Sequence, residues 1–224
     1  MHPPLRLVIF GWRGVLWDNL GVEYQAIYEL FCKHGKPTPG RSEYQKGRGP
    51  DFAEFCYTHN LPRYVSREEV AETRRRVANQ HPEFLNIFEG VQPTLATCHN
   101  RGLVVAIVSK EPTAIIEERL FQFDLGDFVH TVRGGKGNRA EKLLEVINLH
   151  KVEPAETLFI EDTRDGLMTG KEVGMRTLGV TYGHNDRETI LRAQPEFPNM
   201  AFRRTACLWD VRKIICSIKR DEGR

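Results

Sequence analysis

The chain has 224 residues, with 40% hydrophobic residues, 28% charged residues and a formal net charge of +2. These values are typical of a globular domain and exclude a disordered or low-complexity protein. No segment reaches the roughly 18 consecutive apolar residues that span a bilayer, and the balanced charge argues against nucleic acid, so neither a membrane nor a nucleic acid is expected as a partner.

Continuous apolar runs bounded by turn residues predict buried parallel strands. They cover residues 5–10, 103–109, 129–132, 157–160 and 177–182. Helical patterns cover residues 114–123, 139–149 and 167–173, and a terminal helix is expected at 208–215. This alternation predicts an α/β fold of Rossmannoid type, with a doubly wound parallel sheet and right-handed crossovers.

Residues 19–88 break this alternation, because they contain helical patterns but no convincing buried strand. Ala26, Ile27, Leu30 and Phe31 recur there at helical spacing. A helical insertion after the first strand predicts a cap over the carboxyl edge of the sheet, where open α/β sheets bind their ligands. The expected organisation is a core domain of residues 1–18 and 89–224 and a helical cap of residues 19–88.

The five cysteines form an odd set without close metal-ligand spacing. They are Cys32, Cys56, Cys98, Cys207 and Cys216. Such a set favours reduced, packed thiols over disulfides or a zinc site, and it predicts a cytoplasmic setting. Residues 1–10 carry one arginine and a short apolar stretch, which predicts a first strand rather than a secretory signal.

The loop after the first predicted strand carries a recognisable but altered motif. Gly14, Leu16 and the preceding apolar run resemble the first motif of haloacid dehalogenase-like phosphatases, in which the strand leads into aspartate, any residue, aspartate, glycine, threonine and leucine. In that family the first aspartate attacks phosphorus and the second acts as acid and base. Gly11 and Arg13 stand at these two positions, so the resemblance implies that both catalytic groups are missing.

Two further positions resemble phosphate-contacting motifs of the same family. Ser109 ends the second long apolar run, where the family has a serine or threonine that binds a phosphoryl oxygen; by itself it would be read as a turn residue or helix cap. Lys136, between glycines and ahead of the cap residue Asn138, resembles the lysine that neutralises the phosphoryl group. Lys142 is the alternative, and its place within a helical pattern predicts a solvated surface residue.

The loop after residues 157–160 resembles the acidic motif with which the family holds magnesium. Glu161, Asp162 and Asp165 supply carboxylates, whereas Gly166 stands where a second aspartate is expected. The family implies magnesium as a cofactor, but the altered motifs predict that it is absent or weakly bound. We expect Arg13 to pair with one of the three carboxylates in its place, the alternative being that Arg13 points to solvent.

The resemblance extends from residue 5 to residue 215 and points to the phosphoglycolate-phosphatase-like branch with a helical cap. It implies a pseudoenzyme that is catalytically impaired and binds phosphate or a small phosphorylated ligand through Arg13, Ser109 and Lys136. Two alternatives stay open. One is an active magnesium-dependent phosphomonoester hydrolase with an unconventional nucleophile, and the other is a non-catalytic module that binds a protein partner, so the sequence does not decide whether the chain is an enzyme.

Overall fold

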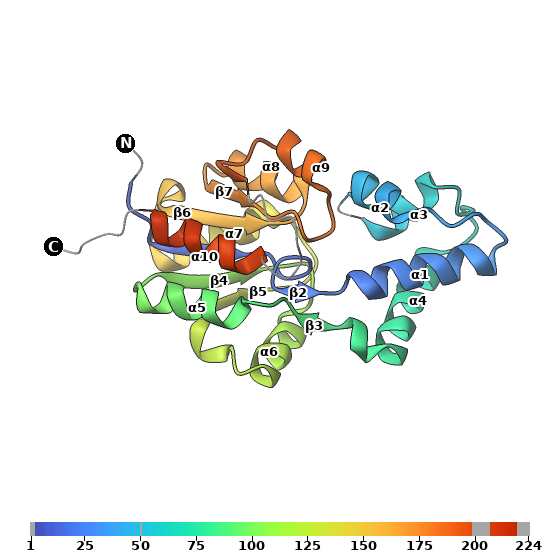
Figure 1. Cartoon of the computed structure of the whole chain (residues 1–224), viewed down its shortest axis with the longest axis horizontal. Coiled ribbons are helices and arrows are strands. Elements are labelled where there is room, and N and C mark those ends of the chain that lie inside the picture. Colours follow the sequence, from blue (N-terminus) through green and yellow to red (C-terminus); the bar gives the residue numbers. More distant parts are fainter. Residues whose placement is uncertain (1–2, 50, 199–206, 219–224) are drawn as a thin grey trace.

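A six-stranded sheet forms the larger part of the molecule (Figure 1). The computed structural model describes residues 3–49, 51–198 and 207–218. The strand order is β5-β4-β1-β6-β7-β8 and neighbouring strands are parallel. The strands are β1 Leu7–Phe10, β4 Val104–Val108, β5 Thr131–Arg133, β6 Thr157–Glu161, β7 Arg176–Gly179 and β8 Phe197–Pro198. The predicted α/β class with a parallel sheet is confirmed.

Helices cover both faces of the sheet, which explains why its central strands are apolar at successive positions. Val8 and Phe10 of β1 share a hydrophobic cluster with α5 (Val91–Asn100), α6 (Thr113–Gln122) and α10 (Cys207–Ser217). Leu7 and Ile9, which point to the opposite face, share a cluster with α7 (Arg139–His150). Both faces of the central strand are buried, and the sequence therefore shows a continuous apolar run there.

Two short elements near the sheet, α9 (Arg187–Arg192) and β8, were not predicted from the sequence, because elements of six and two residues are too short to show a periodicity. The helix α8 spans Arg164–Glu172 and follows β6. β7 ends at Gly179 rather than at residue 182, because residues 181–185 form a series of bends. Single turns of 3-10 helix lie at Pro82–Phe84, Gly126–Phe128 and Pro154–Glu156.

The helices between β2 (Trp17–Asp18) and β3 (Asn86–Ile87) form a lobe beside the carboxyl edge of the sheet, seen on the right of Figure 1. Its helices are α1 Leu20–Lys33, α2 Arg41–Gly47, α3 Phe52–Thr58 and α4 Arg67–Gln80. They bury their own hydrophobic cluster, in which Phe31 and Tyr44 are fully enclosed. Where the chain leaves and returns to the sheet, β2 pairs with β3 in antiparallel fashion. β3 is short and not buried, so the apolar pattern does not reveal it.

Two further findings concern membrane-spanning helices and the cysteines. No helix in the described ranges is long and apolar enough to cross a membrane. Cys32, Cys56, Cys98 and Cys216 are free thiols, whereas the side chain of Cys207 lies outside the described part of the structure.

The separate core of the helical lobe predicts a strong effect of truncating Phe31. Phe31 is 0% exposed and Phe121, on the outer face of α6, is 85% exposed. We expect Phe31→Ala to lower the free energy of unfolding by about 3–5 kcal/mol, because a buried phenyl ring leaves a cavity. Phe121→Ala, the control, should change it by less than about 0.5 kcal/mol. Urea unfolding followed by circular dichroism measures both, and equal losses would contradict a packed core in the lobe.

Candidate functional site

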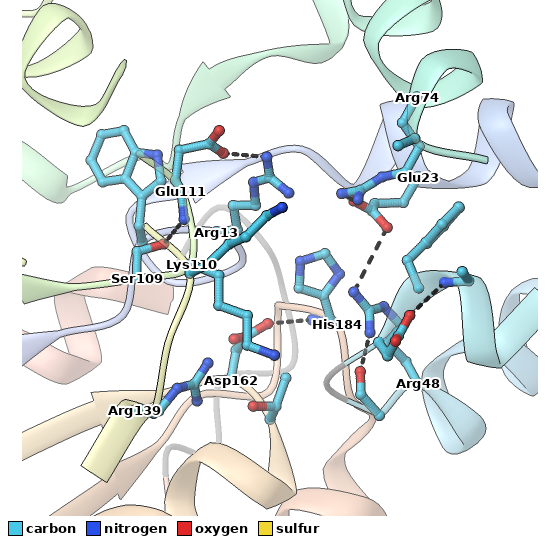
Figure 2. Close-up of a pocket in the computed structure, with 18 of the residues that line it drawn as sticks. Arg13, Glu23, Arg48, Arg74, Ser109, Lys110, Glu111, Arg139, Asp162 and His184 are labelled. Carbon is cyan, nitrogen blue, oxygen red and sulfur yellow. Dashed lines mark hydrogen bonds and ion pairs between the residues drawn. The ribbon is translucent and has the colours of Figure 1, made fainter. Parts of the chain in front are cut away.

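The carboxyl ends of the central strands meet at the edge of the sheet that faces the helical lobe. Phe10, the last residue of β1, lies opposite Ile107 of β4 and Ile160 of β6. A cavity of about 440 Å³ lies between the loops that follow these strands and the lobe (Figure 2). Its lining includes the predicted site residues Arg13, Ser109, Lys136, Glu161 and Asp162. Asp165 is exposed and is not part of the lining.

The carboxylate of Glu161 fills the space where a side chain at position 11 would stand. A Cβ atom on Gly11 would lie 2.6 Å from Oε2 of Glu161 and 2.9 Å from Cγ2 of Val15, closer than non-bonded atoms approach. Glu161 has a side chain that is 4% exposed, and it accepts a hydrogen bond of 2.7 Å from the Thr163 hydroxyl. The place of the expected nucleophile is thus taken by a carboxylate from a different strand.

Arg139, the first residue of α7, neutralises that carboxylate. Its Nη1 lies 3.4 Å from Oε2 of Glu161. A Cβ atom on Gly166 would collide with the Arg139 guanidinium and would lie 2.7 Å from Cδ of Glu161. Gly11 and Gly166, the two positions that lack expected carboxylates, therefore both border the Arg139–Glu161 ion pair.

Asp162 is buried where two loops approach each other closely. Its Oδ2 accepts a hydrogen bond of 2.7 Å from the backbone N–H of His184. A Cβ atom on Gly14 or Gly183 would collide with the carboxyl group, and Gly14 also has a φ of +76°, which favours glycine. Burial raises the pKa of Asp162 and the neighbouring Glu161 raises it further, so the neutral carboxyl is favoured.

Arg13 pairs with Glu111 rather than with the acidic loop, so the predicted pairing is wrong. Nη2 of Arg13 contacts Oε2 of Glu111, which lies in the loop after β4, and the Arg13 side chain is 37% exposed. The reason is that Asp162 is enclosed by loop backbone and that Glu161 already has Arg139 as its partner. An arginine does reach the acidic loop, but it comes from α7.

The two candidate lysines differ in their surroundings. Lys142 donates hydrogen bonds to the backbone carbonyls of Ser109, at 3.0 Å, and Gly135, so it joins two loops and is not the solvated residue that the sequence predicted. Lys136 lies exposed at the rim of the cavity, and no hydrogen bond or ion pair engages it within the described ranges. Oγ of Ser109 accepts a hydrogen bond of 3.0 Å from the N–H of Glu111, which leaves the hydroxyl hydrogen available to a ligand.

Positive charges crowd this wall of the cavity, and Lys110 adds one that the sequence analysis did not identify. Partial burial lowers the pKa of Lys110, and the positive charge of Arg139 lowers it further. Burial and the charge of Arg139 also lower the pKa of Lys142. The contribution of Arg139 to these shifts reflects repulsion between cations, which a bound anion would relieve.

A buried polar network joins the helical lobe to the loop after β7, and we call it the clasp. Its members are Glu23, Tyr44, Arg48, Arg74 and His184. Oη of Tyr44 lies 2.8 Å from Nδ1 of His184 and accepts a hydrogen bond of 3.2 Å from Nε of Arg48. Glu23 is fully buried and forms ion pairs with Arg74 and, at 4.0 Å, with Arg48. Glu23, Arg48 and Arg74 line the cavity from the lobe, and His184 lines it from the loop after β7 (Figure 2).

Asn185 strengthens this junction through backbone groups. Its Nδ2 donates to the carbonyls of Gln45, at 3.1 Å, and Arg48, at 2.8 Å, while its Oδ1 accepts from the N–H of Arg164 at 2.9 Å. The Asn185 side chain thus connects α2 of the lobe with the start of α8.

The residues present do not fit the magnesium ion that the resemblance implies. Magnesium requires several charged or polar oxygen ligands in near-octahedral geometry. Glu161 is paired with Arg139, and Asp162 is enclosed by loop backbone and accepts a hydrogen bond from the N–H of His184. Within the residues that the structure describes, no group of three or more His, Cys, Asp or Glu side chains could hold a metal ion.

Sequence comparisons with known proteins agree on one family of hydrolases. A sequence model described as haloacid dehalogenase-like hydrolase matches residues 8–180. Phosphoglycolate phosphatase from Pseudomonas syringae pv. tomato is 26% identical over 235 residues, which covers 98% of this chain and 86% of that protein. Phosphoglycolate phosphatase from Yersinia pseudotuberculosis is 26% identical over 206 residues, which covers 86% of this chain and 88% of that protein.

Solved structures show the same fold. A haloacid dehalogenase-like family hydrolase from Streptococcus pneumoniae superposes with a TM-score of 0.74 at 18% identity, covering 89% of this chain and 95% of that chain. A haloacid dehalogenase-like protein from Agrobacterium tumefaciens superposes with a TM-score of 0.75 at 18% identity, covering 95% of this chain and 100% of that chain.

The packing of Glu161 against Gly11 predicts a strong coupling between the two positions. Gly11→Asp should lower the free energy of unfolding by about 1–3 kcal/mol, because its Cβ atom would overlap Glu161 and its carboxylate would face a like charge. Glu161→Gly in the same chain makes room and lets the introduced carboxylate pair with Arg139. The double variant should therefore be more stable than the sum of the single changes by about 1–3 kcal/mol in urea unfolding.

The control for this cycle is Gly126→Asp combined with Glu161→Gly, because nothing lies within 4 Å of a Cβ atom built on Gly126. The two changes should add without coupling there. Additive effects at position 11 would show that Glu161 does not occupy the space beside Gly11.

The clasp predicts a loss of stability in acid that depends on His184. Burial lowers the pKa of His184 from 6.5 to about 3. Burial alone would raise the pKa of Glu23, but Arg74 and Arg48 lower it from 4.5 to about 2. Both groups therefore stabilise the folded state above their unfolded pKa values, and each contribution is lost as the pH falls toward the folded value.

The measurement is the difference in free energy of unfolding between the wild type and His184→Asn. This difference should decrease by up to about 1.4 kcal/mol per pH unit as the pH falls below 6.5. The raised pKa of Asp162 acts in the opposite direction, but it is common to both proteins because the N–H of residue 184 is retained. A difference that stays constant between pH 7 and pH 4 would contradict a buried neutral His184.

Proposed function

Because the chain belongs to the haloacid dehalogenase-like hydrolase family, we propose that it is a catalytically impaired relative of phosphatases that binds a phosphorylated small molecule without hydrolysing it. The observation that carries this proposal is the carboxylate of Glu161 packed into the space beside Gly11. A nucleophilic side chain is missing at that position, and its volume is filled by a group that has another role.

Neither Glu161 nor Arg13 replaces the missing chemistry. Covalent catalysis requires a nucleophile with an activating base. Glu161 is held by Arg139 and by the Thr163 hydroxyl, which lowers its capacity to attack phosphorus. Arg13 is paired with Glu111, and a guanidinium has no hydrogen-bond acceptor, so Arg13 does not serve as a base. Loss of a nucleophile lowers the rate by about a million-fold, or roughly 8 kcal/mol of transition-state stabilisation.

Several features of the cavity support binding of a phosphoryl group. Ser109 has a free hydroxyl hydrogen, Lys136 has a free ammonium group at the rim, and Lys110 lies among other cations. The relatives named phosphoglycolate phosphatases make 2-phosphoglycolate and inorganic phosphate the first probes. In this proposal residues 19–88 act as a cap that selects the ligand, and residues 1–18 and 89–224 form the core domain.

The experiment measures hydrolysis and binding in the same preparation. With 4-nitrophenyl phosphate or 2-phosphoglycolate, turnover should be roughly a million-fold below that of the Pseudomonas syringae phosphatase, with or without magnesium. Inorganic phosphate or 2-phosphoglycolate should raise the melting temperature, because ligands that bind only the folded state stabilise it. Lys136→Ala should reduce this rise, and the control Lys213→Ala, on the exposed face of α10, should not.

The two alternatives give different results in this experiment. Magnesium-dependent turnover that disappears in Glu161→Gln would identify an active hydrolase with an unconventional nucleophile. An unchanged melting temperature at high concentrations of both ligands would instead favour a module that binds a protein partner.

A further inference from the structure

Positive charge exceeds negative charge on the sheet side of the cavity. The charged lining residues described on that side are the cations Arg13, Lys110, Lys136 and Arg139 and the acids Glu111, Glu161 and Asp162. The four cations outnumber the three acids on this wall. A phosphomonoester carries a charge of about −1.5 to −2 at neutral pH, so its phosphoryl group is opposite in sign to the excess charge of the wall.

Arg139 is one of these cations, and part of its guanidinium is available to a ligand. Only Nη1 contacts Glu161, and within the described ranges no other group contacts the Arg139 head group. The side chain is 24% exposed and lines the cavity. A guanidinium that uses one N–H edge for a carboxylate keeps Nε and Nη2 to donate to phosphoryl oxygens, whose geometry the planar fork matches.

The start of α7 holds Arg139 in a defined position. Oδ1 of Asn138 accepts a hydrogen bond of 2.9 Å from the N–H of Ala140 and so caps the helix. One turn later, Lys142 fastens the same helix to the carbonyls of Ser109 and Gly135. The guanidinium is therefore carried by a rigid element that is tied to the loop after β4, which limits the ordering that ligand binding requires.

The same geometry leaves little place for a divalent cation. The Arg139 guanidinium already lies against Glu161, in the volume that a side chain at Gly166 would need. A metal ion at Glu161 would have to displace this guanidinium or stand beside it at close range in a partly buried site, where charges are poorly screened.

We propose that Arg139 takes the place of a metal ion in this cavity: it neutralises Glu161 and, together with Lys110 and Lys136, receives the phosphoryl group of a phosphomonoester dianion. This inference rests on the proposed function, because it concerns the same ligand site. It adds that binding is independent of divalent cations and that the Arg139 charge is required for it.

The experiment is calorimetric titration of the full chain with inorganic phosphate and with 2-phosphoglycolate, each in EDTA and in magnesium. For the wild type we expect dissociation constants that agree within about twofold between the two conditions. Arg139→Met should weaken binding by about ten- to a hundredfold, the range for loss of a charge-assisted hydrogen bond. Arg139→Lys should recover most of the affinity, which a purely structural role for the guanidinium would not produce. Arg133→Met is the matched control, because Arg133 pairs with Glu145 outside the cavity.

A second variant keeps the test valid if Arg139→Met fails to fold, since that change leaves Glu161 buried without its partner. Arg139→Met combined with Glu161→Gln removes both charges and should bind phosphate about ten- to a hundredfold more weakly than Glu161→Gln alone. Glu161→Gln alone frees the guanidinium and should tighten phosphate binding by about fivefold, as expected for removing one nearby negative charge.

The outcomes separate this inference from the proposed function. Phosphate binding that requires magnesium would overturn the inference and leave the proposed function standing. Wild-type affinity in both Arg139→Met variants would overturn it as well. Absence of phosphate and 2-phosphoglycolate binding under both conditions would overturn the inference and the proposed function together. A phosphate response without a 2-phosphoglycolate response would support the inference for the phosphoryl group and exclude that particular ester.

Discussion

The burial of Glu161 at the end of a central strand is the constraint on which the sheet edge depends. A buried carboxylate needs a partner and filled hydrogen-bonding capacity, because desolvation otherwise makes it costly. Arg139 supplies the charge and Thr163 supplies a hydroxyl hydrogen. The space comes from Gly11 and Gly166, which lack the side chains that would compete for it. The changes in the motifs therefore form one arrangement rather than a series of independent losses.

A second buried acid organises the opposite wall by the same principle. Glu23 in the helical lobe is neutralised by Arg74 and Arg48, and these arginines bring Tyr44 and His184 together. The cavity lies between two buried acids, each with arginine partners from other elements. The shape of the cavity depends on these ion pairs. Its positive charge comes from the cations that take no part in them.

The sequence predicted the sheet well and the side-chain partners poorly, for identifiable reasons. Apolar runs mark central strands because both of their faces are buried, and parallel strands then bring Ser109 and Asp162 to one edge. The partner of Arg13 depends on how the loop turns at Gly14, and the hydrophobic periodicity of the sequence does not predict that turn. Arg139 looks like any arginine in the first turn of a helix, and its role depends on Glu161 in a distant segment. Tyr44 and His184, 140 positions apart, carry no shared signal in one sequence.

The clasp affects how readily a ligand enters and leaves the cavity. Lidded enzymes alternate between open and closed forms, and release of product in each cycle requires the lid to separate from the core. Here the junction between lobe and sheet edge is made of hydrogen bonds among buried groups, which water competes for only weakly. Such a junction favours one lasting arrangement over repeated opening. A cavity that keeps its walls in place suits retention of a molecule better than rapid throughput.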